Sequence, residues 1–139
     1  MFRLNKLTIL NLKWILISGL FISINSCQYD PSDINISFNE CEYMLLDTNV
    51  VIVDVRTQSE IKEGFIYGAR FMNFYDNEFK NQISTLDKQK PTIVYCQKGG
   101  RSLKTCKMMH EMGFERVYNL EGGSYGWFMH GKKMTIPEK

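Results

Sequence analysis

Two kinds of apolar pattern alternate along the chain. Continuous apolar, β-branched runs occur at 50–55 and 92–95, and such runs are typical of strands buried on both faces of a parallel sheet. Further strands are predicted at 34–38, 69–74 and 117–120, the first of them a short strand or an extended entry. These runs define the expected sheet.

Helices are predicted between the strands, because apolar residues there recur every three or four positions. Asn39 is the expected N-cap of the first helix, and Gly113 is the expected C-terminal cap of the fourth. The predicted ranges are 39–47, 59–63, 76–86, 102–112 and 124–130. Repeated alternation of strand and helix predicts an α/β domain whose parallel sheet is covered by helices on both faces.

The N-terminus does not follow this alternation. Arg3, Lys6 and Lys13 are basic, no acidic residue precedes Asp30, and an uncharged, mostly apolar run covers only 14–24. That run is shorter than the roughly 20 residues that a membrane-spanning helix needs. We interpret 1–26 as a secretory signal peptide.

The residues that follow the apolar run, Ile24-Asn25-Ser26-Cys27, resemble the end of a bacterial lipoprotein signal. In this interpretation Cys27 carries the lipid, 27–35 is a tether and 36–137 is the domain. The protein would be exported and anchored to a membrane by its N-terminal lipid, facing the periplasm or the exterior of a bacterial cell. Asn25 is not the small apolar residue that the motif prefers, so an ordinary cleaved signal or an uncleaved anchor stays an alternative.

Charge and composition exclude two classes of protein. Residues 1–27 contain three of the 17 basic residues and no acid, so the remainder has 14 basic and 15 acidic residues, a net charge of −1. A nearly neutral body is a poor candidate for nonspecific nucleic-acid binding. With 44% hydrophobic and 23% charged residues, the 139-residue chain is not a disordered protein.

Cys96 lies between the predicted strand 92–95 and the predicted helix 102–112, where ligands bind in open α/β sheets. Gly99 and Gly100 allow a tight turn, which directs backbone N–H groups and the positive end of the helix dipole toward one point. Basic residues lie within or just after this loop, namely Lys98, Arg101, Lys104 and Lys107. Such surroundings lower a thiol pKa from about 8.5, so we predict a nucleophilic thiolate at neutral pH.

A purely structural buried cysteine is the alternative for each thiol. It accounts for Cys41 and Cys106, which fall on apolar faces of predicted helices, but not for the glycines and cations around Cys96. His110 and His130 lie late on helices, where neither can act as a base for Cys96. No Cys/His spacing typical of zinc is present, so we predict neither a metal nor another cofactor.

Several segments, taken in order, resemble the single-domain rhodaneses, a family of sulfurtransferases. They are Val53-Asp54-Val55-Arg56 with Glu60 and Gly64, then Gly68-Ala69, Cys96-Gln97-Lys98-Gly99-Gly100-Arg101-Ser102, Gly113-Phe114, Leu120-Glu121-Gly122-Gly123 and Trp127. The resemblance covers roughly 36–137, and several motifs together are far more specific than one. It implies a doubly wound parallel sheet of roughly five strands with helices on both faces.

The resemblance also implies a reaction. Cys96 would take a sulfane sulfur from a small sulfur-containing anion such as thiosulfate, hold it as a persulfide, and pass it to a thiol, cyanide or a protein acceptor. The N–H groups of Gln97 through Ser102 would stabilise the sulfur, and Lys98 and Arg101 would attract the donor. We expect an ion-pair network to support the loop from below, formed by Asp54, Arg56, Glu60 and Arg101. Ordinary surface charges are the alternative for these four.

One segment departs from the family. The family's usual Gly-His-Ile-Pro-Gly-Ala is replaced by Gly64-Phe65-Ile66-Tyr67-Gly68-Ala69, without the histidine and the proline. This stretch shapes the turn into the next strand. We therefore expect an altered rim around the site rather than lost chemistry.

Three other functions were weighed. A cysteine phosphatase has five residues between cysteine and arginine, whereas four separate Cys96 from Arg101. A thiol redox protein needs a nearby resolving cysteine, and Cys106 lies too far along the helix. A non-catalytic protein-binding or sulfur-carrier module stays the main alternative. The sequence leaves the oligomeric state open, with a monomer favoured.

Overall fold

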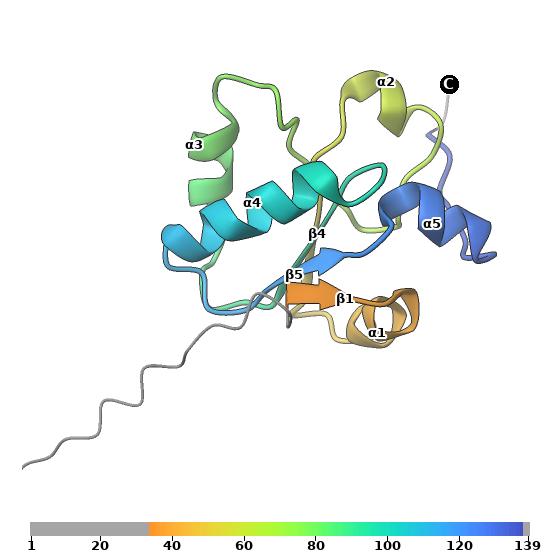
Figure 1. The fold of residues 1–139 in the computed structure, drawn as a ribbon, viewed down its shortest axis with the longest axis horizontal. Coiled ribbons are helices and arrows are strands. Elements are labelled where there is room, and N and C mark those ends of the chain that lie inside the picture. Colours follow the sequence, from red (N-terminus) through yellow and green to blue (C-terminus); the bar gives the residue numbers. More distant parts are fainter. Residues whose placement is uncertain (1–33, 138–139) are drawn as a thin grey trace, which may run out of the picture.

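The computed structural model describes residues 34–137, in which strands and helices alternate as expected (Figure 1). The strands are β1 (Asn35–Ile36), β2 (Val51–Asp54), β3 (Arg70–Phe71), β4 (Thr92–Tyr95) and β5 (Val117–Leu120). The helices are α1 (Phe38–Met44), α2 (Gln58–Ile61), α3 (Phe79–Ser84), α4 (Gly100–Glu111) and α5 (Gly123–Met129).

The five strands form one parallel sheet in the order β1-β5-β4-β2-β3. β4 lies in the middle and is buried along its whole length; it pairs with β2 through Ile52 and Ile93 and with β5 through Thr92 and Val117. All five strands point the same way, so their carboxyl ends meet at one edge, where ligands bind in such sheets. The prediction of a doubly wound parallel α/β sheet is confirmed.

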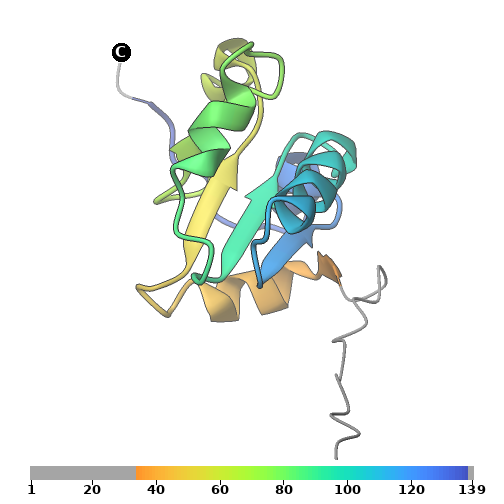
Figure 2. The same cartoon turned by 90° about the vertical axis from the view of Figure 1, so that its left-hand side faces the viewer.

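Each face of the sheet has its own apolar core, because successive residues of a strand point to opposite faces. Val53 and Val94 pack with Phe79, Ile83 and Met109 under α3 and α4. Ile52 and Ile93 belong to the opposite core, which includes Cys41 of α1 and Trp127 of α5. In Figure 2, α3 and α4 lie on the near side of the strands and α5 lies behind them.

The predicted helix starts differ from the observed ones by one to three residues. Ser37, not Asn39, is the N-cap of α1, since its side chain accepts from the Glu40 N–H while Glu40 accepts from the Ser37 N–H. Thr57 and Glu60 make the same reciprocal bonds at the start of α2. Both are capping boxes, which satisfy N–H groups that the first helical turn leaves unpaired.

The predicted strand 69–74 is also shorter than expected, because β3 lies at the sheet edge and pairs with β2 only at Arg70 and Phe71. Helix α3 begins at Phe79 rather than at 76, since Asp76 accepts from the Glu78 N–H in the preceding turn.

The N-terminal predictions lie mostly outside the described residues. Those are the signal peptide 1–26, the lipidation site Cys27 and the tether up to 33. Ile34 and Asn35, the last two tether residues, belong to the folded body, where Ile34 is buried and Asn35 pairs with Asn119. Across 34–137, no helix has the length and apolar character to cross a bilayer.

Candidate active site around Cys96

Cys96 directly follows β4, so the central strand delivers its side chain to the carboxyl edge of the sheet. The chain then turns sharply at Gly99, whose φ of 97° is in the left-handed region that favours glycine, and α4 begins at Gly100. The start of α4 is thereby folded back over the sulfur. This is the loop that the sequence places at the site.

The loop directs hydrogen-bond donors at the sulfur. The Gly99 N–H lies 3.1 Å from Cys96 Sγ, and the Ser102 hydroxyl lies 3.5 Å from it. Burial raises the pKa of the thiol, but hydrogen bonds from Ser102 and from the Lys98 and Gly99 amides outweigh it and lower the pKa from its ordinary value. A thiolate is the form that such donors stabilise.

The Ser102 side chain has two acceptors within reach. Its Oγ is 3.0 Å from the Gly99 carbonyl oxygen and 3.5 Å from Cys96 Sγ. One hydroxyl carries one proton, so Ser102 donates either to the carbonyl or to the sulfur. It can therefore respond to negative charge on the sulfur by rotating about a single bond.

The other described cysteines have opposite surroundings. Cys41 and Cys106 are free and fully buried. Burial raises the pKa of Cys41 to about 12 and also raises that of Cys106. Both match the structural interpretation of these residues. Of the three, only Cys96 is set for nucleophilic chemistry.

Asp54 and Arg56 form a buried ion pair beside the loop. Arg56 Nη2 lies 2.6 Å from Asp54 Oδ2, and Nε lies within 3.0 Å of both carboxylate oxygens. The same guanidinium donates to the Gly64 carbonyl at 2.8 Å and lies 5.5 Å from the centre of the Tyr95 ring. The pair thus ties the end of β2 to the turn after α2.

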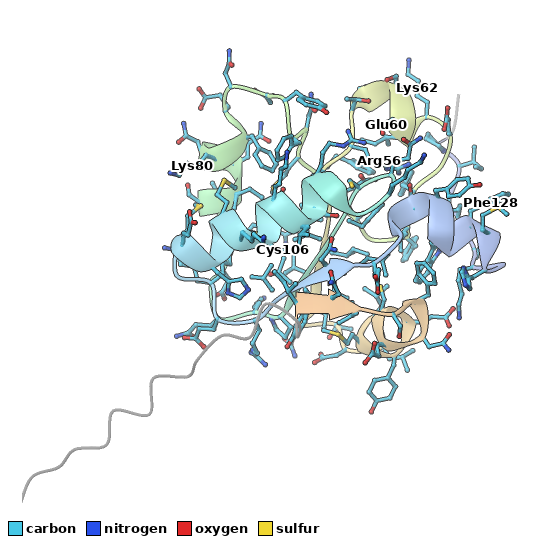
Figure 3. The ribbon with its side chains drawn as sticks, in the orientation of Figure 1. Arg56, Glu60, Lys62, Lys80, Cys106 and Phe128 are labelled. Atoms are coloured by element: carbon cyan, nitrogen blue, oxygen red, sulfur yellow. The ribbon has the colours of Figure 1, made fainter. Side chains whose placement is uncertain are left out.

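Glu60 and Arg101 form a second, half-buried pair that joins α2 to the first turn of α4. Arg101 Nη1 lies 2.8 Å from Glu60 Oε2, and Nη2 bonds Oε1. Hydrogen bonds from Arg101 and Thr57 lower the pKa of Glu60 to about 2. The two pairs connect through a backbone atom, because Arg56 Nη1 donates to the Glu60 carbonyl at 3.3 Å; Arg56 and Glu60 lie close together in Figure 3.

The remaining predicted site residues differ in their surroundings. Gln97, Lys98 and Gly100 are exposed. Lys98 takes part in none of the ion pairs found among residues 34–137. Arg101 is committed to Glu60 and lies 5.7 Å from the centre of the Tyr75 ring. Lys98 is therefore the cation of the loop that stays free of a carboxylate.

Helix α5 fixes the loop from behind, which the sequence did not predict. The Ser124 N–H donates to the Cys96 carbonyl at 2.8 Å, and the Tyr125 N–H donates to the Gln97 carbonyl at 3.0 Å. This close approach requires Gly123, since a Cβ there would lie 2.3 Å from the Cys96 oxygen. The two glycines after the strand 117–120 are the signal that could have located this contact.

A pocket of about 260 Å³ opens beside the loop on the α5 side. Apolar and aromatic side chains dominate its wall, with Arg56 and Glu63 among the polar ones. Phe128 lies on the outer side of α5 (Figure 3) and is 64% exposed. The wall includes Gln97, Ser124, Tyr125, Phe128, Met134 and Ile136.

In the segment that departs from the family's pattern, Gly64 lines this pocket, and Phe65 and Tyr67 do not. Phe65 takes the position of the family's histidine and pairs with Thr135 through two backbone hydrogen bonds of 2.9 and 2.8 Å. Its ring packs edge-on against Phe71, with centroids 5.0 Å apart. Tyr67, in place of the proline, is exposed. Within 34–137, no group of three or more His, Cys, Asp or Glu side chains is arranged to hold a metal ion.

Replacing Gly123 tests the contact between α5 and the loop. We expect Gly123→Ala to lower the free energy of unfolding by about 1–3 kcal/mol more than Gly131→Ala, because its Cβ meets the loop backbone. Gly131 is the matched control, since its φ of 71° is close to the 60° of Gly123 and a Cβ there meets nothing within 4 Å. Urea unfolding of both variants measures the difference, and equal losses would contradict the contact.

Comparison with known proteins agrees with this geometry. The model of the rhodanese-like domain matches residues 37–130. A sulfurtransferase of Allochromatium vinosum is 35% identical over 95 residues, which cover 68% of this chain and 87% of the relative. The thiosulfate sulfurtransferase GlpE of Coxiella burnetii is 34% identical over 59% of this chain and 75% of its own. The crystal structure of a rhodanese-like domain protein from Staphylococcus aureus superimposes with a TM-score of 0.64 at 27% identity, covering 75% and 98% of the two chains. The chain therefore belongs to the rhodanese-like family.

Proposed function

We propose that this protein is a sulfurtransferase that moves a sulfane sulfur from a donor such as thiosulfate to a thiophilic acceptor through a persulfide on Cys96. The observation that carries the proposal is the set of donors around Cys96 Sγ, with the Gly99 N–H at 3.1 Å and the Ser102 hydroxyl at 3.5 Å. The names of the relatives support the same class of reaction.

The reaction consists of two displacements at sulfur. The Cys96 thiolate attacks the outer sulfur of thiosulfate, an S–S bond forms at Sγ, and sulfite leaves with the electron pair of the broken S–S bond. An acceptor thiolate or cyanide then attacks the outer sulfur of the persulfide, and the Sγ–S bond breaks. Its electron pair returns to Cys96, so no net oxidation or reduction of the protein occurs and no base is needed once the thiol is ionised.

Each surrounding group has a role in this scheme. The N–H groups from Gln97 to Ser102 stabilise the negative sulfur before and after transfer, as preorganised donors do at other anionic centres. Lys98 attracts the anionic donor, because its charge is not neutralised by a carboxylate among residues 34–137. Arg101 supports the loop through Glu60, and Asp54 with Arg56 supports the neighbouring turn.

The other candidate functions fit the site less well. A phosphatase needs an arginine directed at the bound phosphate, whereas Arg101 is engaged by Glu60. A redox protein needs a second thiol within disulfide reach of the first, and Cys106 is fully buried on the inner face of α4. A protein-binding module needs no donors directed at a cysteine sulfur, which the Gly99 N–H and the Ser102 hydroxyl provide at Cys96. A sulfur carrier would share the Cys96 persulfide and differs from the transferase in producing no thiocyanate.

Loading with thiosulfate tests the proposal. We expect the peptide that contains Cys96 to gain the mass of one sulfur atom after incubation, and the protein to convert thiosulfate and cyanide into thiocyanate and sulfite. Cys96→Ser should abolish both, while Cys106→Ser should keep both because that thiol is buried away from the loop. An unmodified Cys96 together with no thiocyanate would leave the non-catalytic module as the better account.

We further propose that Cys27 is lipidated, which places the protein on a membrane facing the periplasm or the cell exterior. The support is the basic start, short apolar run and cysteine described above. When the full chain is expressed in a bacterium fed with labelled palmitate, the mature protein should carry the label, and Cys27→Ser should lose it. An unlabelled protein cleaved at another bond would instead indicate an ordinary signal peptide.

A further inference from the structure

Three exposed lysines extend from the Cys96 loop along α4. Lys98 lies in the loop, and Lys104 and Lys107 follow on the helix. The ion pairs found within 34–137 are Arg56–Asp54, Arg101–Glu60 and Lys132–Glu42, so none of the three lysines is paired with an acid there. We call Lys98, Lys104 and Lys107 the lysine row.

The row lies on the solvent side of the helix. Ser102, Cys106 and Met109 of α4 are buried toward the sheet, and Lys104 and Lys107 occupy the opposite, exposed face. Figure 3 shows Cys106 on the same helix, between α4 and the rest of the domain. The row therefore begins at Lys98 in the active-site loop and continues outside the site through Lys104 and Lys107.

Two of these charges, those of Lys98 and Lys104, do not serve the stability of α4. The N-terminal end of a helix carries partial positive charge, so cations there are unfavourable and anions favourable. Lys98 and Lys104 flank the first turn of α4, which contains no acidic residue. Their placement is explained better by an anion outside the chain than by the helix itself.

The row is too long for a small donor. With a rise of about 1.5 Å per residue, Lys107 lies roughly 10 Å along the axis from Gly100, where the helix begins. Thiosulfate bound at Cys96 cannot reach that far. An extended acidic surface can contact the loop and both helical lysines together.

The opposite side of the site carries acidic side chains, and the Arg56 that lines the pocket there is neutralised by Asp54. Glu63 lines the pocket on the α5 side, and Glu121 is exposed directly after β5. The unpaired lysines that adjoin the Cys96 loop and α4, Lys98, Lys104 and Lys107, lie on the α4 side, whereas Lys62 sits beside Glu63. A partner attracted by charge would approach over α4 rather than over α5, which gives it one orientation.

We propose that the lysine row docks an acidic protein that exchanges sulfur with Cys96 through its own cysteine. This inference rests on the proposed sulfurtransferase function and names the class of acceptor. The acceptor thiolate attacks the outer sulfur of the Cys96 persulfide, the Sγ–S bond breaks, and the electron pair returns to Cys96. The acceptor leaves as a persulfide, so atoms and charge balance.

A protein fits this surface better than a membrane does. A helix that binds a bilayer surface carries large apolar side chains beside its basic residues, whereas the exposed positions of α4 are Gly100, Lys104, Lys107 and Glu111. The apolar residues of α4 that are partly accessible, Leu103 and Met108, pack against the core. The lysine row therefore has no exposed apolar side chains on α4 that could insert into a bilayer.

The test compares two synthetic peptides that each contain one cysteine, flanked by glutamates in one and by glutamines in the other. The full chain in nonionic detergent is loaded with thiosulfate, and sulfur transfer to each peptide is followed by mass spectrometry. We expect the acidic peptide to react about tenfold faster at low salt. This preference should fall toward equality as salt shortens the Debye length to about 8–10 Å.

The decisive variant is Lys104→Gln with Lys107→Gln, which should lose most of the preference for the acidic peptide. Its rate of loading by thiosulfate should stay within about twofold of wild type, since neither side chain lies in the loop and the groups that lower the pKa of Cys96 are Ser102 and the Lys98 and Gly99 amides. Lys80→Gln with Lys90→Gln is the matched control. It removes the same charge from exposed positions, one of them on α3 (Figure 3), and should keep the preference.

Results that contradict the docking surface can be told apart from results that contradict the proposed sulfurtransferase function. Equal rates for the two peptides, or an equal loss in both double variants, would overturn the docking surface while leaving sulfur loading intact. If Cys96 cannot be loaded at all, the affinity of a fluorescent acidic peptide for wild type and for the Lys104/Lys107 variant still decides the docking claim. A third outcome is that the Lys104/Lys107 variant keeps the preference for the acidic peptide but binds phosphatidylglycerol vesicles more weakly than wild type, with no change on neutral vesicles. The partner would then be a membrane and the proposal would be wrong.

Discussion

The hydrogen bonds that reach the sulfur of Cys96 are the interaction on which the rest of the site depends. A buried thiol is ordinarily neutral, because burial penalises its charged form. At Cys96 that penalty is outweighed by the Gly99 and Lys98 amides and by Ser102. The groups that favour the thiolate at this site are loop amides and a hydroxyl, and no histidine is among them. The site depends on a loop backbone that keeps its N–H groups directed at the sulfur.

β4, α4 and α5 together hold the loop in place. β4 holds Cys96 from within the sheet, and the first turn of α4 closes over it. The N-terminus of α5 holds the carbonyls of Cys96 and Gln97 through Ser124 and Tyr125, at a distance that only a glycine at 123 permits. The first N–H groups of α5 thus bond the loop carbonyls. The donors at the start of α4 are directed at the sulfur of Cys96.

Local pattern predicted the core of the fold well. β4 and β5 begin and end where the sequence places them, because a strand buried on both faces has few alternatives to a continuous apolar run. The capping boxes at Ser37 and Thr57 were missed although their spacing to Glu40 and Glu60 is visible in the sequence. The short extent of β3 was not predictable, since it depends on how much of an edge strand finds a partner.

The sequence predicted the parts of the site whose residues are neighbours in the chain. It did not predict the contacts between residues that are far apart in the chain. Cys96, the glycines and the cations are neighbours in sequence, so their meaning could be argued from spacing. The contact of Gly123 with the Cys96 carbonyl and the bond between Glu60 and Arg101 join segments that only the sheet order brings together. The most direct test of the account is the titration of Cys96, followed by the ultraviolet absorbance of its thiolate in wild type minus Cys96→Ser. We expect a midpoint clearly below the ordinary value of about 8.5 and a higher one in Ser102→Ala; a wild-type midpoint at or above about 8.5 would contradict this.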